Sequence, residues 1–256
     1  MVVRLNPGAQ KSKYSMNIYK SKKFAETWHR HTKKDVLRIK MMNKIMEEAV
    51  GNLKGKIVLE AGCGDGFFIP NLLRKNPKKV IGIDISRWLI DIAKKEIKVK
   101  NVEFYQMNLR KRLNFRDNVF DVIVSYNVLQ EIKDISIPLR EMTRVLKKRG
   151  KLIISIIHPL YHLFVSAVET KNLPPIETLK RYPKIEPIHS TAIKGFEKFF
   201  VVYRKPISYY VNGIVKNKLK IIEMKDVSIP PKIGKISKKH RDRAGLPIFL
   251  FFKLEK

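Results

Sequence analysis

Residues 56–68 read KIVLEAGCGDGFF, a short apolar strand that runs into three glycines and then into a helical pattern. Glycine at Gly62, Gly64 and Gly66 lets the backbone turn sharply and approach a ligand, because no Cβ stands in the way. The strand ends in an acid, Glu60, whereas a loop that holds a pyrophosphate normally follows the spacing GxGxxG. The segment therefore indicates a nucleotide site that is not built for a pyrophosphate.

Two further strand ends add polar side chains to this site. Asp84 follows Gly66 by 18 residues and ends the next strand, where it can accept hydrogen bonds from both hydroxyls of a ribose. The strand after that ends near Met107 and Asn108, where a polar side chain can meet an adenine amino group beside apolar neighbours. Glu60 favours a cationic group. Together these features suit a nucleoside with a cationic tail, such as S-adenosylmethionine.

Short β-branched runs alternate with helical segments through the middle of the chain. The predicted strands are Ile57–Leu59, Val80–Ile83, Val102–Tyr105, Phe120–Val124 and Leu152–Ile157, and the helical patterns lie around Phe67–Arg74, Trp88–Lys98, Leu129–Glu131 and Ile137–Leu146. Strands this apolar are buried on both faces, and their alternation with helices indicates parallel crossover units. The pattern predicts an α/β protein with a doubly wound sheet.

Four segments carry a family resemblance: VLEAGCGDG (58–66), VIGIDIS (80–86), FDVIVSYNVLQE (120–131) and VLKKRGKLIIS (145–155). The chain resembles the class I, Rossmann-like S-adenosylmethionine-dependent methyltransferases, in the subgroup similar to the ubiquinone- and menaquinone-biosynthesis enzymes. The resemblance implies a seven-stranded, mostly parallel sheet with N-terminal lid helices, an insertion after the fifth strand, and a hairpin of the sixth and seventh strands. Residues 203–208 and 247–253 resemble those late strands. The family resemblance also implies methyl transfer to a small-molecule acceptor, with S-adenosylhomocysteine as product.

The expected organisation is a flexible tail followed by one domain. We expect the tail at 1–14 and the domain at 15–256, divided into N-terminal helices (15–50), a cofactor-binding core (51–158), a substrate-covering insertion (159–202), and a last helix and strand hairpin (203–256). The insertion is rich in proline and aromatic residues, so it cannot continue the sheet. The helices before the core form either a lid or ordinary amphipathic packing.

The resemblance assigns cofactor contacts residue by residue. They are Glu60, Gly62, Cys63, Gly64, Asp84, Ile85, Met107, Asn108, Leu109, Tyr126 and Asn127. Asn108 stands where the family commonly has an aspartate, and it can still accept a hydrogen bond through its amide oxygen. The glycines and Asp84 could alternatively be mere turn and cap residues.

A general base is needed only if the acceptor is a hydroxyl, an acidic carbon or a protonated amine. His158, at the carboxyl end of the fifth strand, is the first candidate, and Tyr126 is the second. Glu131, Tyr161 and His162 are further candidates from the same edge. His158 could equally be a strand-end residue that the following proline fixes. His158 and His162 have the spacing of a helical metal pair, but that proline argues against a helix, so no metal is expected.

The chain carries 54 Lys and Arg against 23 Asp and Glu, a net charge of +31. Such a charge is typical of proteins that bind nucleic acid or a membrane surface, and it makes RNA methylation the alternative function. The excess is spread along the chain, and a general enrichment in lysine, as in heat-adapted proteins, would give the same spread. A protein that binds the cofactor but has lost activity is a third possibility.

Apolar runs such as 152–157 are far shorter than the roughly 20 residues of a membrane span. The first residues also lack the apolar stretch of a signal peptide. We therefore expect a cytoplasmic protein without a membrane span. The sequence fits a monomer or a homodimer equally.

Overall fold

The structure is a computed structural model of the chain, and it describes residues 18–161, 176–190, 193–197, 199–235 and 241–256. The expected tail at 1–14 lies outside the described residues. The strands are β1 (Ile57–Ala61), β2 (Lys79–Asp84), β3 (Val102–Gln106), β4 (Phe120–Tyr126), β5 (Leu146–Ile157), β6 (Glu186–His189), β7 (Val201–Arg204), β8 (Lys220–Ser228) and β9 (Pro247–Glu255). The helices are α2 (Lys22–Thr32), a π-helix η1 (Arg38–Met42), α3 (Asn43–Val50), α4 (Ile69–Leu73), α5 (Arg87–Glu96), a 3₁₀ turn η2 (Leu129–Glu131), α6 (Ser136–Val145), α8 (Ile176–Lys180), α9 (Ile207–Lys216) and α10 (Pro231–Gly234).

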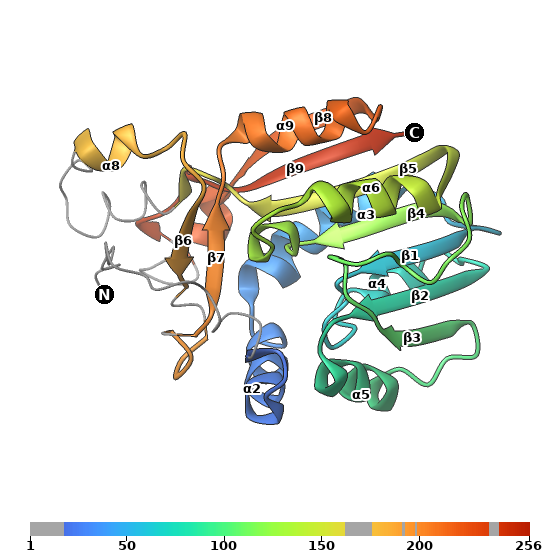
Figure 1. Cartoon of the computed structure of the whole chain (residues 1–256). Coiled ribbons are helices and arrows are strands. Elements are labelled where there is room, and N and C mark those ends of the chain that lie inside the picture. Colours follow the sequence, from blue (N-terminus) through green and yellow to red (C-terminus); the bar gives the residue numbers. More distant parts are fainter. Residues whose placement is uncertain (1–17, 162–175, 191–192, 198, 236–240) are drawn as a thin grey trace.

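The central sheet has seven strands in the order β3-β2-β1-β4-β5-β9-β8 (Figure 1). β1 to β5 are parallel to one another, whereas β9 is antiparallel to both β5 and β8. The order of the strands reverses between β1 and β4, and in doubly wound sheets such a switch point opens a crevice at the carboxyl ends of the strands. The predicted doubly wound, mostly parallel sheet of seven strands is confirmed.

Alternating side chains of the sheet build two separate cores. Val58 of β1 packs in a core with residues of α3, α4 and α5, whereas the next residue, Leu59, packs in a core with residues of α6 and α9. β4 repeats this alternation with Val122 and Ile123. Successive side chains of a strand point to opposite faces. Both faces of the sheet are therefore covered at its centre, as the apolar strands predicted, whereas the edge strand β3 is only partly buried because it has a neighbour on one side alone.

The prediction that residues 203–208 form a late strand of the central sheet is wrong. Residues of this segment do not join the central sheet: β7 ends at Arg204 and pairs antiparallel with β6 in a separate two-stranded sheet. Pro206 caps α9, and it ends the strand because proline has no N–H to donate to a ladder. The hairpin at the end of the central sheet is instead formed by β8 and β9.

The N-terminal helix α2 packs against the β6–β7 sheet, beyond the carboxyl ends of the parallel strands (Figure 1). Ser21 begins the helix, since its hydroxyl accepts a hydrogen bond from the Phe24 N–H at 3.2 Å. Phe24 is fully buried, and its ring lies 5.2 Å from Phe196 and 6.0 Å from Phe200, centroid to centroid. Two segments far apart in the sequence thus share one apolar cluster above the crevice.

Candidate functional site

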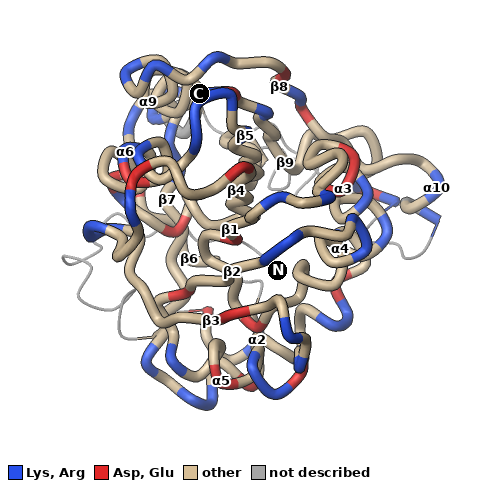
Figure 2. The backbone as a smooth tube through the Cα atoms, turned by 90° about the vertical axis from the view of Figure 1, so that its right-hand side faces the viewer, with Lys and Arg blue, Asp and Glu red and all other residues tan. Residues whose placement is uncertain are grey.

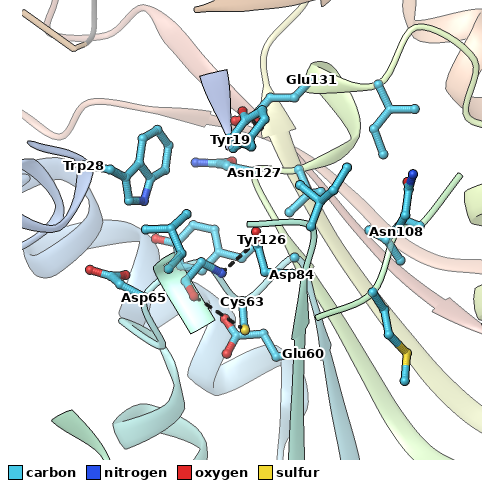
Figure 3. Close-up of a pocket in the computed structure, with 18 of the residues that line it drawn as sticks. Tyr19, Trp28, Glu60, Cys63, Asp65, Asp84, Asn108, Tyr126, Asn127 and Glu131 are labelled. Carbon is cyan, nitrogen blue, oxygen red and sulfur yellow. Dashed lines mark hydrogen bonds between the residues drawn. The ribbon is translucent and has the colours of Figure 1, made fainter. Parts of the chain in front are cut away.

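A cavity of about 1080 Å³, including its open mouth, lies at the carboxyl ends of β1 to β4 (Figure 3). Every residue predicted to contact the cofactor lines it: Glu60, Gly62, Cys63, Gly64, Asp84, Ile85, Met107, Asn108, Leu109, Tyr126 and Asn127. The rest of the described wall consists of Tyr19, Trp28, Arg38, Asp65, Phe67, Phe68, Leu89, Arg110, Val128, Glu131, Ile132, Lys133 and Tyr203. The strand ends that the sequence placed together therefore do converge on one space.

The glycine loop is held against β2 by its own backbone. The N–H groups of Gly62 and Cys63 both donate to the Ile83 carbonyl, at 2.8 and 2.9 Å. Gly62 has φ +84°, and a Cβ there would lie 2.4 Å from Cγ2 of Val128. Glycine is thus required at position 62 for both its backbone angle and its lack of a side chain.

Asp84 connects the end of β2 to this loop. Its Oδ2 accepts the Gly64 N–H at 3.0 Å, and its Oδ1 accepts the Ser86 N–H at 2.8 Å. Burial raises the pKa of Asp84 to about 6, and these backbone hydrogen bonds oppose the rise. The carboxylate is fixed in orientation and still has lone pairs that can accept from a ligand's hydroxyl groups.

Glu60 is a buried carboxyl, and only 2% of its surface is exposed. Within the part of the chain that the structure describes, its Oε2 has no hydrogen-bond partner. Burial raises its pKa, as does the charge of Asp65, whereas Arg38 lowers it. A buried acid without a partner is costly, and a cationic ligand would relieve that cost. The buried Glu60 carboxyl therefore fits the positively charged sulfonium and ammonium groups of S-adenosylmethionine.

Asn108 and Tyr126 complete the predicted contacts. The amide oxygen of Asn108 accepts the Arg110 N–H at 3.0 Å, which leaves its second lone pair and its amino group for a ligand. The hydroxyl of Tyr126 donates to Oδ1 of Asn43 at 3.2 Å, and burial raises its pKa. Tyr126 is therefore held protonated, with its hydroxyl engaged by Asn43.

The N-terminal segment, which the sequence offered as either a lid or ordinary packing, supplies wall residues that the sequence did not name. The guanidinium of Arg38 lies 5.4 Å from the ring centroids of both Trp28 and Tyr126. Arg38 begins the π-helix η1, a helical irregularity that is frequent at functional sites. No local pattern marks these residues, because they reach the cavity only after α2 has packed against the core.

The far end of the cavity is formed by η2 and Tyr19. Glu131, a further candidate base in the sequence, accepts a hydrogen bond from the Tyr19 hydroxyl through Oε2. Burial raises the pKa of Glu131 to about 8. Tyr203, which immediately follows the expected insertion at 159–202, also lines the cavity, whereas no described residue of that insertion does.

The first candidate base, His158, does not line this cavity. It lies beside a second, smaller space with Lys205 and Tyr210, and 3% of its surface is exposed. Its Nδ1 accepts the Leu160 N–H at 3.2 Å, so Nε2 carries the proton and donates to Oδ1 of Asp226 at 3.0 Å. Ser155 of β5 pairs with Tyr126, the last residue of β4, and β5 continues two residues further, so His158 lies beside Asp226 of β8 rather than in the cavity.

Two other candidate bases from this edge stay outside the described wall. Tyr161 packs against the first core, and its hydroxyl accepts a hydrogen bond from Nη1 of Arg243 at 2.9 Å. His162 lies outside the described residues.

The methyltransferase domain family matches residues 52–187, which is more than half of the chain. The chain belongs to the class I S-adenosylmethionine-dependent methyltransferases. The demethylmenaquinone methyltransferase of Lactococcus lactis is 33% identical over 162 residues, covering 58% of this chain and 62% of that protein. The ubiquinone biosynthesis O-methyltransferase of Coxiella burnetii is 29% identical over 126 residues, covering 49% of this chain and 53% of that protein. The matches thus span about half to three fifths of these relatives' length.

The crystal structure of an S-adenosylmethionine-dependent methyltransferase from Mesorhizobium loti has the same fold. It superposes with a TM-score of 0.69 at 17% identity and covers 83% of this chain and 96% of that one. S-adenosylmethionine is accordingly the cofactor of this methyltransferase.

Neither a membrane-spanning helix nor a metal-binding cluster is found in the described ranges. No helix there is both long enough and apolar enough to cross a membrane. The same residues contain no group of three or more His, Cys, Asp or Glu side chains that could hold a metal ion.

Proposed function

We propose that this methyltransferase moves the methyl group of S-adenosylmethionine to a small-molecule acceptor by in-line displacement. The observation that supports it is a single cavity with two chemically different ends (Figure 3). One end carries the glycine loop with Glu60 and Asp84, and the other carries Tyr19, Glu131 and apolar side chains. A donor and a small acceptor could share such a space, and the quinone-type relatives named above act on small molecules by their names.

The residues at the donor end would hold the cofactor through complementary chemistry. Asp84 would accept the ribose hydroxyls, Asn108 would meet the adenine edge, and Glu60 would balance the positive tail. The guanidinium of Arg38 suits a carboxylate such as that of the methionine part. When bound, the cofactor supplies a methyl group that its sulfonium already activates, so the chain's main task is to align the acceptor.

The N-terminal helix and the β6–β7 sheet would act as the cover of this site within one domain, which we propose extends over residues 15–256. Their shared apolar cluster lies above the crevice and includes Phe24 and Phe200. Covering the cavity excludes water and holds the acceptor in line with the donor. The cover is therefore a functional lid as well as ordinary packing.

RNA methylation is the second candidate, and the net charge of +31 is the observation that favours it. Figure 2 shows the basic residues distributed around the backbone rather than gathered at one side. A spread of this kind gives weak binding to any polyanion, and such binding falls steeply with salt. The small acceptor therefore explains the cavity better than RNA does.

The test is transfer of labelled methyl from S-adenosylmethionine to a cell extract separated into small molecules, RNA and protein. Label in the small-molecule fraction supports the proposal. Label in the RNA fraction at about 1 M salt, where purely electrostatic binding collapses, would support the alternative. Label in neither fraction, with S-adenosylhomocysteine still bound, would indicate a binding protein without this activity.

A further inference from the structure

Four described residues with carboxyl groups line the cavity, and three of them lie at the donor end. Asp65 is engaged by α2, Asp84 by two backbone N–H groups, and Glu60 lies beneath the glycine loop. Glu131 lies at the opposite end, beside Tyr19 (Figure 3). Binding of the methyl donor does not explain why Glu131 lies at that end of the cavity.

Glu131 and Tyr19 reach the cavity from elements that are 112 residues apart in the chain. Glu131 ends η2, the turn after β4, and Tyr19 precedes α2 in the lid. The Tyr19 hydroxyl donates to Oε2 of Glu131, which leaves Oε1 free of that bond. Burial raises the pKa of Tyr19, and the charge of Glu131 raises it further. Because Tyr19 belongs to the segment before α2, the Tyr19–Glu131 pair forms only when that lid segment lies over the site.

The groups that face Glu131 come from each surrounding element. Burial raises its pKa to about 8, the Tyr19 hydroxyl lowers it, the charge of Asp84 raises it, and the charges of Arg38 and Lys205 lower it. A base works best when its pKa lies near the operating pH. A carboxyl in these surroundings can take up a proton at neutral pH, which an exposed carboxylate does poorly.

Lys205 fixes the turn that carries Glu131. Its side chain is fully buried, and its Nζ donates to the Leu129 carbonyl at 3.0 Å. The same ammonium lies 5.6 Å from the ring centroid of Tyr203, another residue of the cavity wall. Burial lowers the pKa of Lys205 to about 7. One side chain thus holds both the turn and an aromatic wall of the acceptor end.

Resting on the proposed methyl transfer, we infer that Glu131 is the catalytic base and that the acceptor carries an acidic hydroxyl on a flat apolar framework. In the step, the acceptor oxygen forms a bond to the methyl carbon and the carbon–sulfur bond breaks, with its electron pair remaining on sulfur. The hydroxyl proton passes to the Glu131 carboxylate. The products are a methyl ether, S-adenosylhomocysteine and protonated Glu131, so charge and atoms balance.

The walls of this end match such an acceptor. Tyr203 and Ile132 present aromatic and apolar surface, which suits a planar framework. A neutral amine already has a free electron pair and would need no base before attack, whereas a phenol or enol is a weak nucleophile until its proton leaves. An acidic carbon would need a base as well, so methyl on carbon is one of the results of the test below that would overturn the hydroxyl. The Tyr19 hydroxyl orients the Glu131 carboxyl through their hydrogen bond when the lid lies over the site, so Tyr19 is a positioning residue.

The test compares wild type with Glu131→Gln, Tyr19→Phe and the exposed control Glu48→Gln, using S-adenosylmethionine labelled with ¹³C in its methyl group. A small-molecule cell extract supplies the acceptor, and the ¹³C chemical shift of the product distinguishes methyl on oxygen from methyl on nitrogen, sulfur or carbon. Calorimetry with S-adenosylhomocysteine measures the donor end separately.

We expect methyl on oxygen, and a rate at neutral pH that falls about 100-fold or more in Glu131→Gln, while S-adenosylhomocysteine affinity stays within about twofold of wild type. The wild-type rate levels off above a pH of about 8, whereas the Glu131→Gln rate keeps rising because the acceptor then ionises in solution. Tyr19→Phe lowers the rate less and shifts the pH at which it levels off. Glu48→Gln matches wild type.

Three results would overturn the inference while leaving the proposed function intact: methyl on nitrogen, sulfur or carbon, a Glu131→Gln rate and pH profile equal to wild type, or a loss of S-adenosylhomocysteine affinity as large as the loss of rate. Absence of transfer by the wild-type protein would overturn the proposed function, and the role of Glu131 with it.

Discussion

His29 on α2 and Asp65 in the glycine loop are joined by a hydrogen bond of 2.6 Å between Nδ1 and Oδ2. The hydroxyl of Thr32, one turn further along the helix, donates to the same oxygen at 2.8 Å. Asp65 is 5% exposed and Thr32 is fully buried. The position of the lid helix and the conformation of the cofactor loop therefore depend on one carboxylate.

Removing this carboxylate should loosen the lid. Asp65→Ala removes the carboxylate that joins the loop to both His29 and Thr32 of α2, and losing these charge-assisted hydrogen bonds costs about 1–3 kcal/mol of unfolding free energy. We expect faster amide exchange over α2 and roughly tenfold weaker binding of S-adenosylhomocysteine, measured by exchange mass spectrometry and calorimetry. Asp91→Ala, an exposed substitution on α5, is the control. Unchanged exchange over α2 in Asp65→Ala would show that the helix is held by other contacts.

Gly62 in the glycine loop and Gly55 in the turn before β1 form a matched pair of positions. Gly62 and Gly55 both have positive φ, +84° and +74°, but only at Gly62 would a Cβ meet other atoms, those of Val128. Gly55→Ala should cost only the backbone strain of about 1 kcal/mol, and Gly62→Ala about 1–3 kcal/mol more. Urea unfolding measures both. Adding Val128→Ala to Gly62→Ala should recover part of the loss, and no recovery would mean that the clash is not its cause.

Glu131 should make the ligand-free protein less stable at high pH. Its pKa is about 8 in the folded protein against an ordinary value of 4.5, so between these values the folded state holds a proton that the unfolded chain has lost. The free energy of unfolding therefore falls as pH rises through this range. Glu131→Gln lacks this dependence, so relative to wild type it should gain roughly 1 kcal/mol or more between about pH 5 and pH 9. Urea unfolding of both proteins across this range, with Glu48→Gln as control, tests the sign, and a constant difference would contradict it.

The donor end of the site could be predicted from the sequence because its residues follow strands. Glu60 and Asp84 each come directly after a buried apolar run, Asn108 lies two residues beyond the edge strand β3, and parallel strands bring their carboxyl ends to one edge. The glycine spacing then specifies a loop between the first strand and its helix. At these positions the place of a residue in the local sequence pattern also determines its place in the folded protein, so the sequence was sufficient to predict the site.

The individual residues of the N-terminal wall could not be predicted in the same way. Tyr19, Trp28 and Arg38 reach the cavity through packing between α2 and the β6–β7 sheet, and no spacing in the sequence encodes that contact. His158 illustrates the opposite case, since it ends a parallel strand but β5 extends past the crevice and pairs the histidine with Asp226. The end of this strand at Ile157 was predicted correctly. Its register was not, because the apolar run does not reveal that Ser155 pairs with Tyr126, the last residue of β4, so that β5 continues beyond its neighbour.

The most direct test of the central assignment is calorimetric titration of S-adenosylmethionine into wild type, Asp84→Ala and the control Asp91→Ala. The account predicts one molecule bound to wild type and to the control, and binding about 30-fold weaker or more in Asp84→Ala, because two charge-assisted hydrogen bonds are lost. Equal affinity of Asp84→Ala and wild type, or no binding by wild type, would contradict it.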